Sequence, residues 1–371
     1  MTDPAIPDAW CEVHRDRIDA NIRIALSRVP NGRRFCAVLK ADAYGHGIAT
    51  VVPLVRAHGI DCIAITSNTE ARAVRDAGYT GQLIRLRAAT PSETRAALPD
   101  RVEEQVGTVE AAENLAALRA SGAAVRAHLS LNAMGMSRDG LEIETEQGRA
   151  ACRTILDRLG DSITAICTHF PSNAPDDLRA STALFQQHAD WVLHQGNLSR
   201  DSTLIHAGSS LTLVSDEPAR TDMYRCGAVL YGILKPEWGF QTTMNLKTRV
   251  VSVGDYPAGA TVGYDRTCVL DTPRRLACLS IGYANGIRRA GHNTGTVLIG
   301  GHEAPILGRI SMNTTVADVT GLGDISIGDP AVIFGGSRDT RSALDNAEAQ
   351  FGTIIADLYT DWGLSNHRIT R

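Results

Sequence analysis

The strongest constraint on the fold is an alternation that begins near residue 35, where short apolar runs take turns with longer segments of helical period. The runs are often β-branched and each is long enough for one strand, and this alternation is typical of repeated βα units around a parallel sheet. The runs are 35–40, 62–66, 83–87, 102–107, 125–131, 163–170, 203–207 and 224–231. Eight such strands fit a closed barrel, a fold that needs about 250 residues.

The segments between the runs are amphipathic. Ile18, Ile22 and Ala25 fall on one helical stripe, and so do Phe185 and Ala189. A stripe of this kind packs one face of a helix against a sheet. We therefore expect helices to cover the outside of the barrel.

The texture of the sequence changes after about residue 240. Apolar stretches are joined there by short turns of Gly, Pro and Asp with no helical period between them, at 250–253, 276–281, 297–299 and 331–334. This pattern predicts a mostly-β domain. The predicted fold class is α/β, with an eight-stranded (β/α) TIM-type barrel over residues 1–240 and a mostly-β C-terminal domain over residues 241–371. We expect the first strand, at about residues 9–15, to pair with the β domain.

The charge balance favours a small-molecule partner. Lys and Arg number 37 and Asp and Glu 41, for a net charge of −4, which leaves no basic surplus for nucleic acid or for an anionic membrane surface. The start, MTDPAIPDAW, lacks the basic flank and apolar run of a signal peptide, and no later run of about 18 apolar residues occurs. We expect a cytoplasmic protein with no nucleic-acid or membrane partner.

The spacing of cysteine and histidine predicts no metal site. The 8 cysteines form no CxxC pair, and the 11 histidines form no HxH or HExxH pattern. Structural and catalytic metal sites ordinarily use such spacings.

The most informative stretch is AVLKADAYGHG at residues 37–47, where Lys40 ends an apolar strand. A lysine at the C-terminal mouth of a first barrel strand is partly desolvated, which lowers its pKa and frees the amine to condense with a carbonyl group. From strand position alone, an ammonium that reaches solvent or pairs with Asp42 is the alternative.

The same string resembles the pyridoxal 5'-phosphate (PLP) attachment motif of the alanine racemase family, whose members pair an eight-stranded barrel with a C-terminal β domain. The resemblance extends over the whole chain. It implies that PLP is the cofactor, that Lys40 carries it covalently and that Tyr44 donates to its phosphate.

Two later segments resemble the family's cofactor contacts. HAGSS at 206–210 implies a phosphate contact from Ser209, and MYRCGAVLYG at 223–232 implies that Arg225 donates to the pyridine nitrogen while the amides of Gly227 and Ala228 hold phosphate. A guanidinium can only donate, so the ring nitrogen stays unprotonated, which favours racemisation over transamination. A salt bridge between Arg225 and Asp222 is the alternative.

Racemisation needs an acid and a base on opposite faces of the substrate. The segment VGYDRT at 262–267 resembles the family's catalytic tyrosine motif and implies that Tyr264 is the second base beside Lys40. His169 matches the family histidine that links this tyrosine to the pyridine arginine. The resemblance further implies that Lys40 and Tyr264 meet between two subunits, so that a homodimer with shared active sites is required.

Three more residues match substrate contacts of the family. Tyr283, in IGYANG, matches an entry-gate tyrosine, and the amide of Met312, in GRISMN, matches a contact to the substrate carboxylate. Arg138, in MGMSRDG, matches the arginine that binds that carboxylate and the cofactor phenol, a role that suits a bidentate side chain.

The strings LIRLRAAT, LNAMGMSR and WGLSN resemble the broad-spectrum amino-acid racemase branch, which accepts larger side chains. Arg85 and Arg87, in the first string, are unusual on a barrel strand, and ion pairing with barrel carboxylates is the simple interpretation. The branch also has cysteines at the positions of Cys36 and Cys62, which form a disulfide after export. A signal peptide removed from this chain would therefore give a periplasmic protein instead of the cytoplasmic one expected.

The sequence thus predicts an isomerase that interconverts L- and D-amino acids, alanine and larger or basic ones, by a two-base mechanism. A strict alanine racemase is the alternative. Barrel decarboxylases of basic amino acids share the fold but have a Gly-Gly-Gly phosphate loop and a catalytic cysteine that this sequence lacks. A single-barrel PLP carrier, the non-enzymatic alternative, has the lysine without the β domain.

Overall fold

A computed structural model describes residues 8–217, 219–336 and 340–371. The chain divides into two compact units. One unit comprises residues 22–43 and 51–230, and the other comprises the residues up to 21, residues 44–50 and the residues from 231 on. The first strand and residues 44–50 therefore belong with the C-terminal residues and not with the barrel unit.

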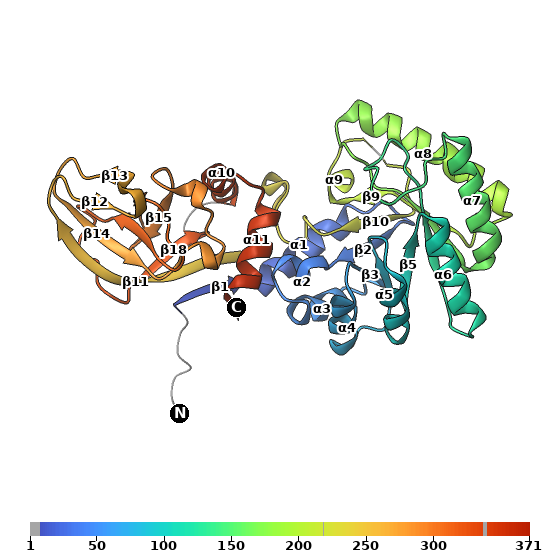
Figure 1. Ribbon diagram of the computed structural model, residues 1–371, viewed down its shortest axis with the longest axis horizontal. Helices are drawn as coiled ribbons and strands as arrows, with labels where there is room; N and C mark the ends of the chain where they lie inside the picture. The colour runs from blue at the N-terminus through green and yellow to red at the C-terminus, as the bar shows by residue number, and fades with distance from the viewer. Residues whose placement is uncertain (1–7, 218, 337–339) are drawn as a thin grey trace. The chain divides into compact units, whose positions relative to one another are not determined.

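The larger unit is a ring of parallel strands (Figure 1). The strands are β2 (Arg34–Val38), β3 (Cys62–Ile65), β4 (Gln82–Arg85), β5 (Val102–Val106), β6 (Ala127–Ser130), β7 (Ile163–Cys167), β8 (Leu204–His206), β9 (Gly208–Ser209) and β10 (Met223–Cys226). Only Ala207 separates β8 from β9, and β8 pairs with β7 while β9 pairs with β10. These two short strands act as one, which confirms the predicted eight-stranded barrel.

Helices cover the outside of this ring, as the amphipathic stripes predict. They are α3 (Ile48–Ala57), α4 (Asn68–Asp76), α5 (Pro91–Ala96), α6 (Val109–Ala120), α7 (Glu146–Leu159), α8 (Pro175–Gly196) and the short α9 (Ser210–Leu213). Phe185 and Ala189 of α8 pack with Ile155 of α7 and Leu129 of β6 in one buried cluster. Burial of these apolar faces stabilises the outer layer, at about 25 cal/mol per Å².

The interior of the barrel is polar. Strand register sets Gln105 beside His128 and Ser130 beside Cys167, which in turn lies beside His206. The interior of a TIM barrel is ordinarily filled by Val, Ile and Leu. This barrel therefore holds polar side chains where apolar packing is the rule, and each of them needs a hydrogen-bond partner.

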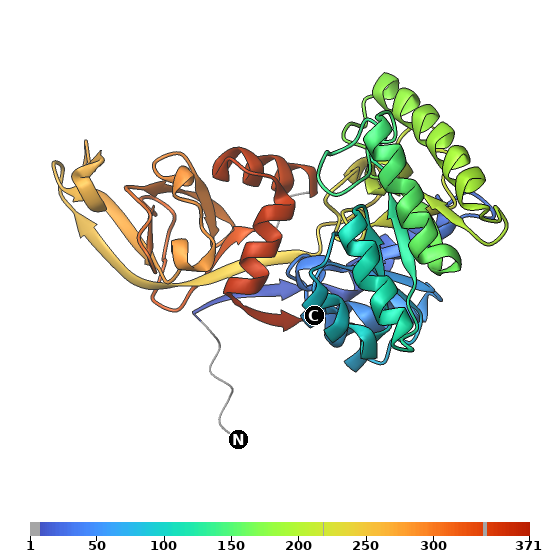
Figure 2. The same ribbon diagram turned by 45° about the vertical axis from the view of Figure 1, so that its right-hand side comes forward.

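The second unit is built around a mostly antiparallel sheet (Figure 2). Its strands are β1 (Ala9–Val13), β11 (Met244–Tyr256), β14 (Arg274–Leu279), β15 (Thr296–Ile299), β16 (His302–Leu307), β17 (Thr315–Asp318), β18 (Pro330–Phe334) and β19 (His367–Thr370), with a small ribbon of β12 (Thr261–Val262) and β13 (Cys268–Val269). Strand β1 is antiparallel to β11 and parallel to β19, and α1 (Arg15–Ser27) follows it. The first strand is thus a member of the C-terminal sheet.

The expectation that no helices lie among the C-terminal strands is wrong. Helices α10 (Thr340–Phe351) and α11 (Ile355–Ser365) precede the last strand. Tyr359 and Trp362 of α11 are fully buried and contact Phe334 of β18, with ring centroids 5.5 and 5.2 Å apart. Leu358, Tyr359 and Trp362 repeat at helical spacing, a local signal that the turn-rich sequence around it obscured.

All eight cysteines are free thiols. Cys36 and Cys62 are register partners on β2 and β3, and their thiols hydrogen-bond to each other. Over the described ranges, no helix combines the length and apolar character needed to cross a bilayer.

Candidate active site

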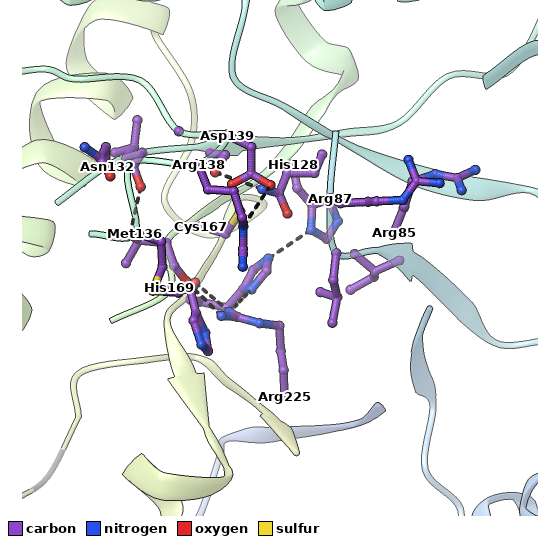
Figure 3. Close-up of a pocket in the computed structure, with 18 of the residues that line it drawn as sticks. Arg85, Arg87, His128, Asn132, Met136, Arg138, Asp139, Cys167, His169 and Arg225 are labelled. Carbon is purple, nitrogen blue, oxygen red and sulfur yellow. Dashed lines mark hydrogen bonds and ion pairs between the residues drawn. The ribbon is translucent and has the colours of Figure 1, made fainter. Parts of the chain in front are cut away.

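One cavity of about 340 Å³ lies at the C-terminal ends of the barrel strands. Among the residues that line it are Lys40, Arg138, His169 and Arg225, which the family resemblance assigns to the site. Figure 3 labels the last three of them. Their neighbours on the wall include Thr66, Arg85, Arg87, Gln105, His128, Asn132, Asp139 and His206. The barrel thus gathers four basic side chains from separate loops and strands into one space.

Lys40 is the first residue of a left-handed backbone turn. The turn α2 (Lys40–Tyr44) has φ of 54°, 50° and 58° at Ala41, Asp42 and Ala43, all in the left-handed region. Each such residue costs roughly 1–2 kcal/mol, so the segment needs outside support. Glu70 supplies it, because its Oε1 accepts from the Ala41 amide at 2.7 Å.

The same Glu70 also organises the start of α4. Its Oε2 accepts from the amides of Thr66 and Ser67 at 2.7 and 3.0 Å. Ser67 completes a capping box by accepting from the Glu70 amide. One carboxylate therefore ties the loop after β3 to the turn that carries Lys40.

The electrostatic surroundings of Lys40 favour its neutral amine. Burial and the nearby Arg138 charge lower the pKa of the Lys40 ammonium, and Glu70 only partly opposes them. A lowered pKa increases the fraction of amine that can act as a nucleophile or base at neutral pH.

Arg138 lies on a loop that Asn132 holds in place. The Asn132 Oδ1 accepts from the Ser137 amide at 2.8 Å, and its Nδ2 donates to Glu142 Oε2 at 2.9 Å. The ion pair of Arg138 with Asp139 uses Nε at 3.7 Å. Among the residues that the structure describes, the terminal nitrogens of Arg138 have no protein partner, which leaves its bidentate edge for an anion.

Arg225 is a buried cation without a direct carboxylate. Its Nη1 donates to His206 Nδ1 and O at 2.6 and 3.0 Å, and its Nη2 donates to Thr168 O at 2.8 Å. Asp222, the alternative partner, instead pairs with Arg33 and Arg200 at 2.9 and 2.8 Å. Burial lowers the pKa of Arg225, yet a guanidinium keeps its proton throughout the neutral range.

His169 faces the cavity as a neutral imidazole. Burial and the charges of Arg225, Arg138 and Lys40 lower the pKa of His169 to about 4. At neutral pH it therefore adds a hydrogen-bonding group and no charge.

In the segment HAGSS, a second serine that the sequence analysis did not single out lies beside Gly227. Ser209 caps α9 and is the register partner of Arg225. The adjacent Ser210 accepts from the Gly227 amide at 3.0 Å, and Ala228 follows Gly227 directly. The sequence alone does not distinguish Ser209, which caps α9, from Ser210, which contacts Gly227.

The remaining predicted residues belong to the other unit. Tyr264, Tyr283 and Met312 expose 67%, 43% and 55% of their surface, so all three side chains are accessible. A Cβ at Gly282 would lie 2.4 Å from Met312 O, so the chains at Tyr283 and Met312 approach closely only because residue 282 is glycine. Tyr44 packs on Tyr231, with ring centroids 4.8 Å apart.

The two arginines of the third barrel strand form ion pairs. Arg85 is fully buried and holds Glu104 with two hydrogen bonds, Nε to Oε2 at 2.7 Å and Nη2 to Oε1 at 3.1 Å. Arg87 pairs with Glu93. The hydrogen bond from Arg87 is the largest of the causes that lower the pKa of Glu93 to about 2. The simple interpretation of these arginines therefore agrees with their contacts.

Two family models match the chain. One, described as alanine racemase, N-terminal domain, covers residues 13–235, and the other, alanine racemase, C-terminal domain, covers residues 243–370. Together they span far more than half of the 371 residues.

Comparison with individual proteins also finds racemases. A broad specificity amino-acid racemase of Pseudomonas putida is 42% identical over 98% of this chain and 89% of that protein. A lysine racemase of Proteus mirabilis is 34% identical over 99% of this chain and 90% of that protein. The fold matches an alanine racemase of Bartonella henselae, solved with covalently bound pyridoxal phosphate, at a TM-score of 0.84, 23% identity and coverage of 99% of this chain and 100% of that one.

Proposed function

This chain belongs to the alanine racemase family and is an amino-acid racemase, and from that premise we propose that it uses PLP and two bases to interconvert L- and D-amino acids larger than alanine as well as alanine itself. The observation that carries the proposal is the meeting of Lys40, Arg138, His169 and Arg225 in one cavity. A set of basic groups around a small cavity suits an anionic cofactor and a carboxylate substrate.

The donor set fits PLP group by group. The amine of Lys40 suits covalent attachment to an aldehyde, the buried Arg225 can only donate to a ring nitrogen, and the terminal nitrogens of Arg138 suit a phenol oxygen or a carboxylate. Ser209, Gly227, Ala228 and Tyr44 would hold the phosphate. When bound, this cofactor withdraws electrons from the substrate α-carbon and makes its proton removable.

The residues of this chain then have separate tasks. Arg138 and the amide of Met312 would orient the substrate carboxylate, and Tyr283 would limit entry. Lys40 Nζ would take or return the α-proton on one face, and Tyr264 Oη would do so on the other. Burial and the Arg225 charge keep His169 neutral. A neutral imidazole has one acceptor nitrogen, so His169 can accept a hydrogen bond that keeps Tyr264 oriented.

We propose a homodimer in which Tyr264 of one subunit serves Lys40 of the other. Tyr264 is 67% exposed in the single chain, so its phenol is accessible to a partner subunit. The closed two-fold symmetry of most homo-oligomers would give two equivalent sites.

Acceptance of larger substrates has two kinds of support. Relatives across the whole length carry the names broad specificity amino-acid racemase and lysine racemase. The cavity wall also presents polar side chains, among them Arg87, Gln105 and Asn132, that can solvate a polar substrate side chain. Strict alanine specificity is the alternative, and one methylene in a pocket is worth only about 1–3 kcal/mol of discrimination.

The test is the loss of optical rotation of L-alanine, L-serine, L-lysine and L-arginine by the purified protein with added PLP. We expect kcat/KM for lysine or arginine to reach at least about one tenth of that for the best substrate, a difference within about 1.4 kcal/mol. Turnover of alanine alone would contradict the broad range, and turnover of none would contradict the racemase assignment.

Replacing Tyr264 by phenylalanine should remove one base and keep the cofactor. We expect racemisation to fall by about 10²–10⁴-fold, equally in both directions because the two enantiomers have equal free energy. Exchange of the α-hydrogen with D₂O should survive for one enantiomer only, the one whose proton faces Lys40. Proton NMR of each enantiomer in D₂O measures this.

The same variant tests the shared site. When Tyr264→Phe and Lys40→Ala are co-expressed in equal amounts, half of the dimers contain one subunit of each kind. One of the two sites in such a dimer has both Lys40 and Tyr264, so we expect about one quarter of wild-type activity. No recovery in dimers shown to be mixed would contradict the arrangement between subunits. Exchange that survives equally for both enantiomers would contradict the role of Tyr264.

A further inference from the structure

A continuous chain of side chains crosses the polar interior of the barrel from the cavity towards its other end. Arg225 Nη1 lies 2.6 Å from His206 Nδ1, His206 Nε2 lies 2.9 Å from His128 Nδ1, and His128 Nε2 lies 2.9 Å from Glu103 Oε2. The four residues come from β10, β8, β6 and β5 and are each 8% exposed or less. The dashed lines in Figure 3 follow the part between Arg225 and His128.

The chemistry of its two ends fixes the direction of every hydrogen bond. A guanidinium has no acceptor, so His206 Nδ1 must accept from Arg225 and its ring proton must lie on Nε2. That proton can only be donated to His128 Nδ1, which places the His128 proton on Nε2 as well. His128 then donates to Glu103. Both imidazoles are therefore neutral and are held in the same tautomer.

The far end of the chain is an ionised carboxylate. Burial opposes ionisation of Glu103, but the hydrogen bonds that His128 and Gln82 donate and the charge of Arg126 outweigh it and lower the pKa of Glu103. Gln82 Nε2 lies 2.8 Å from Oε2, and Arg126 Nε lies 3.1 Å from Oε1. At the near end, burial and the Arg225 charge lower the pKa of His206 well below its usual range, which keeps this ring neutral.

We propose that Glu103, acting through His128 and His206, is a positioning residue that serves as the remote counter-charge of Arg225 and fixes its guanidinium as a donor towards the cavity. Buried cations ordinarily have a carboxylate beside them. In the described part of the chain, Arg225 has no carboxylate within ion-pair distance, and only this relay connects it to one. The inference rests on the proposed function for its catalytic consequence but not for the relay itself.

The relay can be tested without cofactor or activity. In the cofactor-free protein labelled with ¹⁵N-histidine, we expect His206 and His128 both to show a protonated Nε2 and an unprotonated Nδ1. Signals are assigned by comparison with His128→Gln and His206→Gln. A proton on Nδ1 of either ring, or a doubly protonated ring, would overturn the proposal.

A charge-removing variant tests whether the relay transmits. In Glu103→Gln the Nε2 proton signals of both rings should move, that of His206 included, although Glu103 touches only His128. The matched control is Glu144→Gln, which alters another carboxylate on a buried histidine, His188, at 2.6 Å, and should move neither signal. A shift confined to His128 would overturn the relay.

Should Glu103→Gln fail to fold, the exposed Arg126 offers a milder change. Arg126→Gln removes a cation from Glu103 Oε1, and we expect smaller shifts of the same two Nε2 protons. An unchanged His206 signal in this variant would equally overturn the relay.

The catalytic consequence is measured separately in the PLP-loaded enzyme. Glu103→Gln should lower kcat about 10–100-fold, the size of effect known for partners that orient metal-ligating histidines, with KM little changed and Glu144→Gln at the wild-type rate. An unchanged kcat would overturn the positioning role. If the wild-type protein does not racemise amino acids, the proposed function fails, whereas the NMR result still decides the relay.

Discussion

Lys40→Ala is expected to abolish racemisation, with turnover at least about 10³-fold below that of the wild type. The variant removes both the covalent anchor of the cofactor and one of the two bases. We also expect it to lose the visible absorbance that the wild-type protein gains on addition of PLP. Polarimetry and absorbance titration measure the two losses.

The scarcity of lysine makes this result unusually clear. The chain has only three lysines, Lys40, Lys235 and Lys247, so reduction of the loaded wild-type protein with borohydride should fix the cofactor mass to the peptide that contains Lys40. Lys235→Ala is the matched control, because Lys235 lies in an exposed turn and pairs with Glu237 at 3.6 Å. Cofactor mass on another lysine, or turnover by Lys40→Ala near that of the control, would contradict the assignment.

Glu104→Gln is expected to destabilise the fold by about 3–5 kcal/mol. The substitution keeps the shape of the side chain but removes the charge that faces Arg85, which is 0% exposed. A guanidinium buried without its counter-charge is costly, because solvation cannot compensate for the lost ion pair. Urea unfolding followed by circular dichroism gives the free energy of unfolding.

An exposed ion pair supplies the control for this prediction. Asp161 is 90% exposed and lies 3.2 Å from Arg119, so Asp161→Asn should cost less than about 1 kcal/mol. Equal effects of the two substitutions would mean that the Arg85–Glu104 pair adds no more than a surface contact. Such an outcome would leave the burial of Arg85 without its main energetic support.

Much of the barrel was predictable because its signal is local. Each of the eight apolar runs encodes its own strand, and the stripe through Phe185 and Ala189 encodes the face of one helix. Helices α10 and α11 were not predicted, because the stretch of apolar residues at helical spacing is short there and lies among turn-forming residues. The left-handed turn at Ala41–Ala43 also gave no signal, since alanine rarely adopts that conformation, and the support comes from Glu70, far along the chain.

In the candidate site, too, some residues could be predicted from local sequence and others could not. Lys40, Arg138 and Arg225 stand in distinctive strings, and a string can be recognised without knowledge of its neighbours. His128 and Glu103 stand in no such string. Their importance depends on which atoms meet across strands, with 78 residues between His128 and His206, and spacing along the chain carries no information about such a contact.

The place of β1 in the C-terminal sheet has a consequence for biosynthesis. Its residues are synthesised before those of its neighbours β11 and β19, which run from Met244 to Tyr256 and from His367 to Thr370. At about 5–20 residues per second, β1 waits tens of seconds for its final partner. Both edges of β1 stay unpaired until β11 is made, and one edge stays unpaired until β19 is made, so the nascent chain offers chaperones a binding segment during that time.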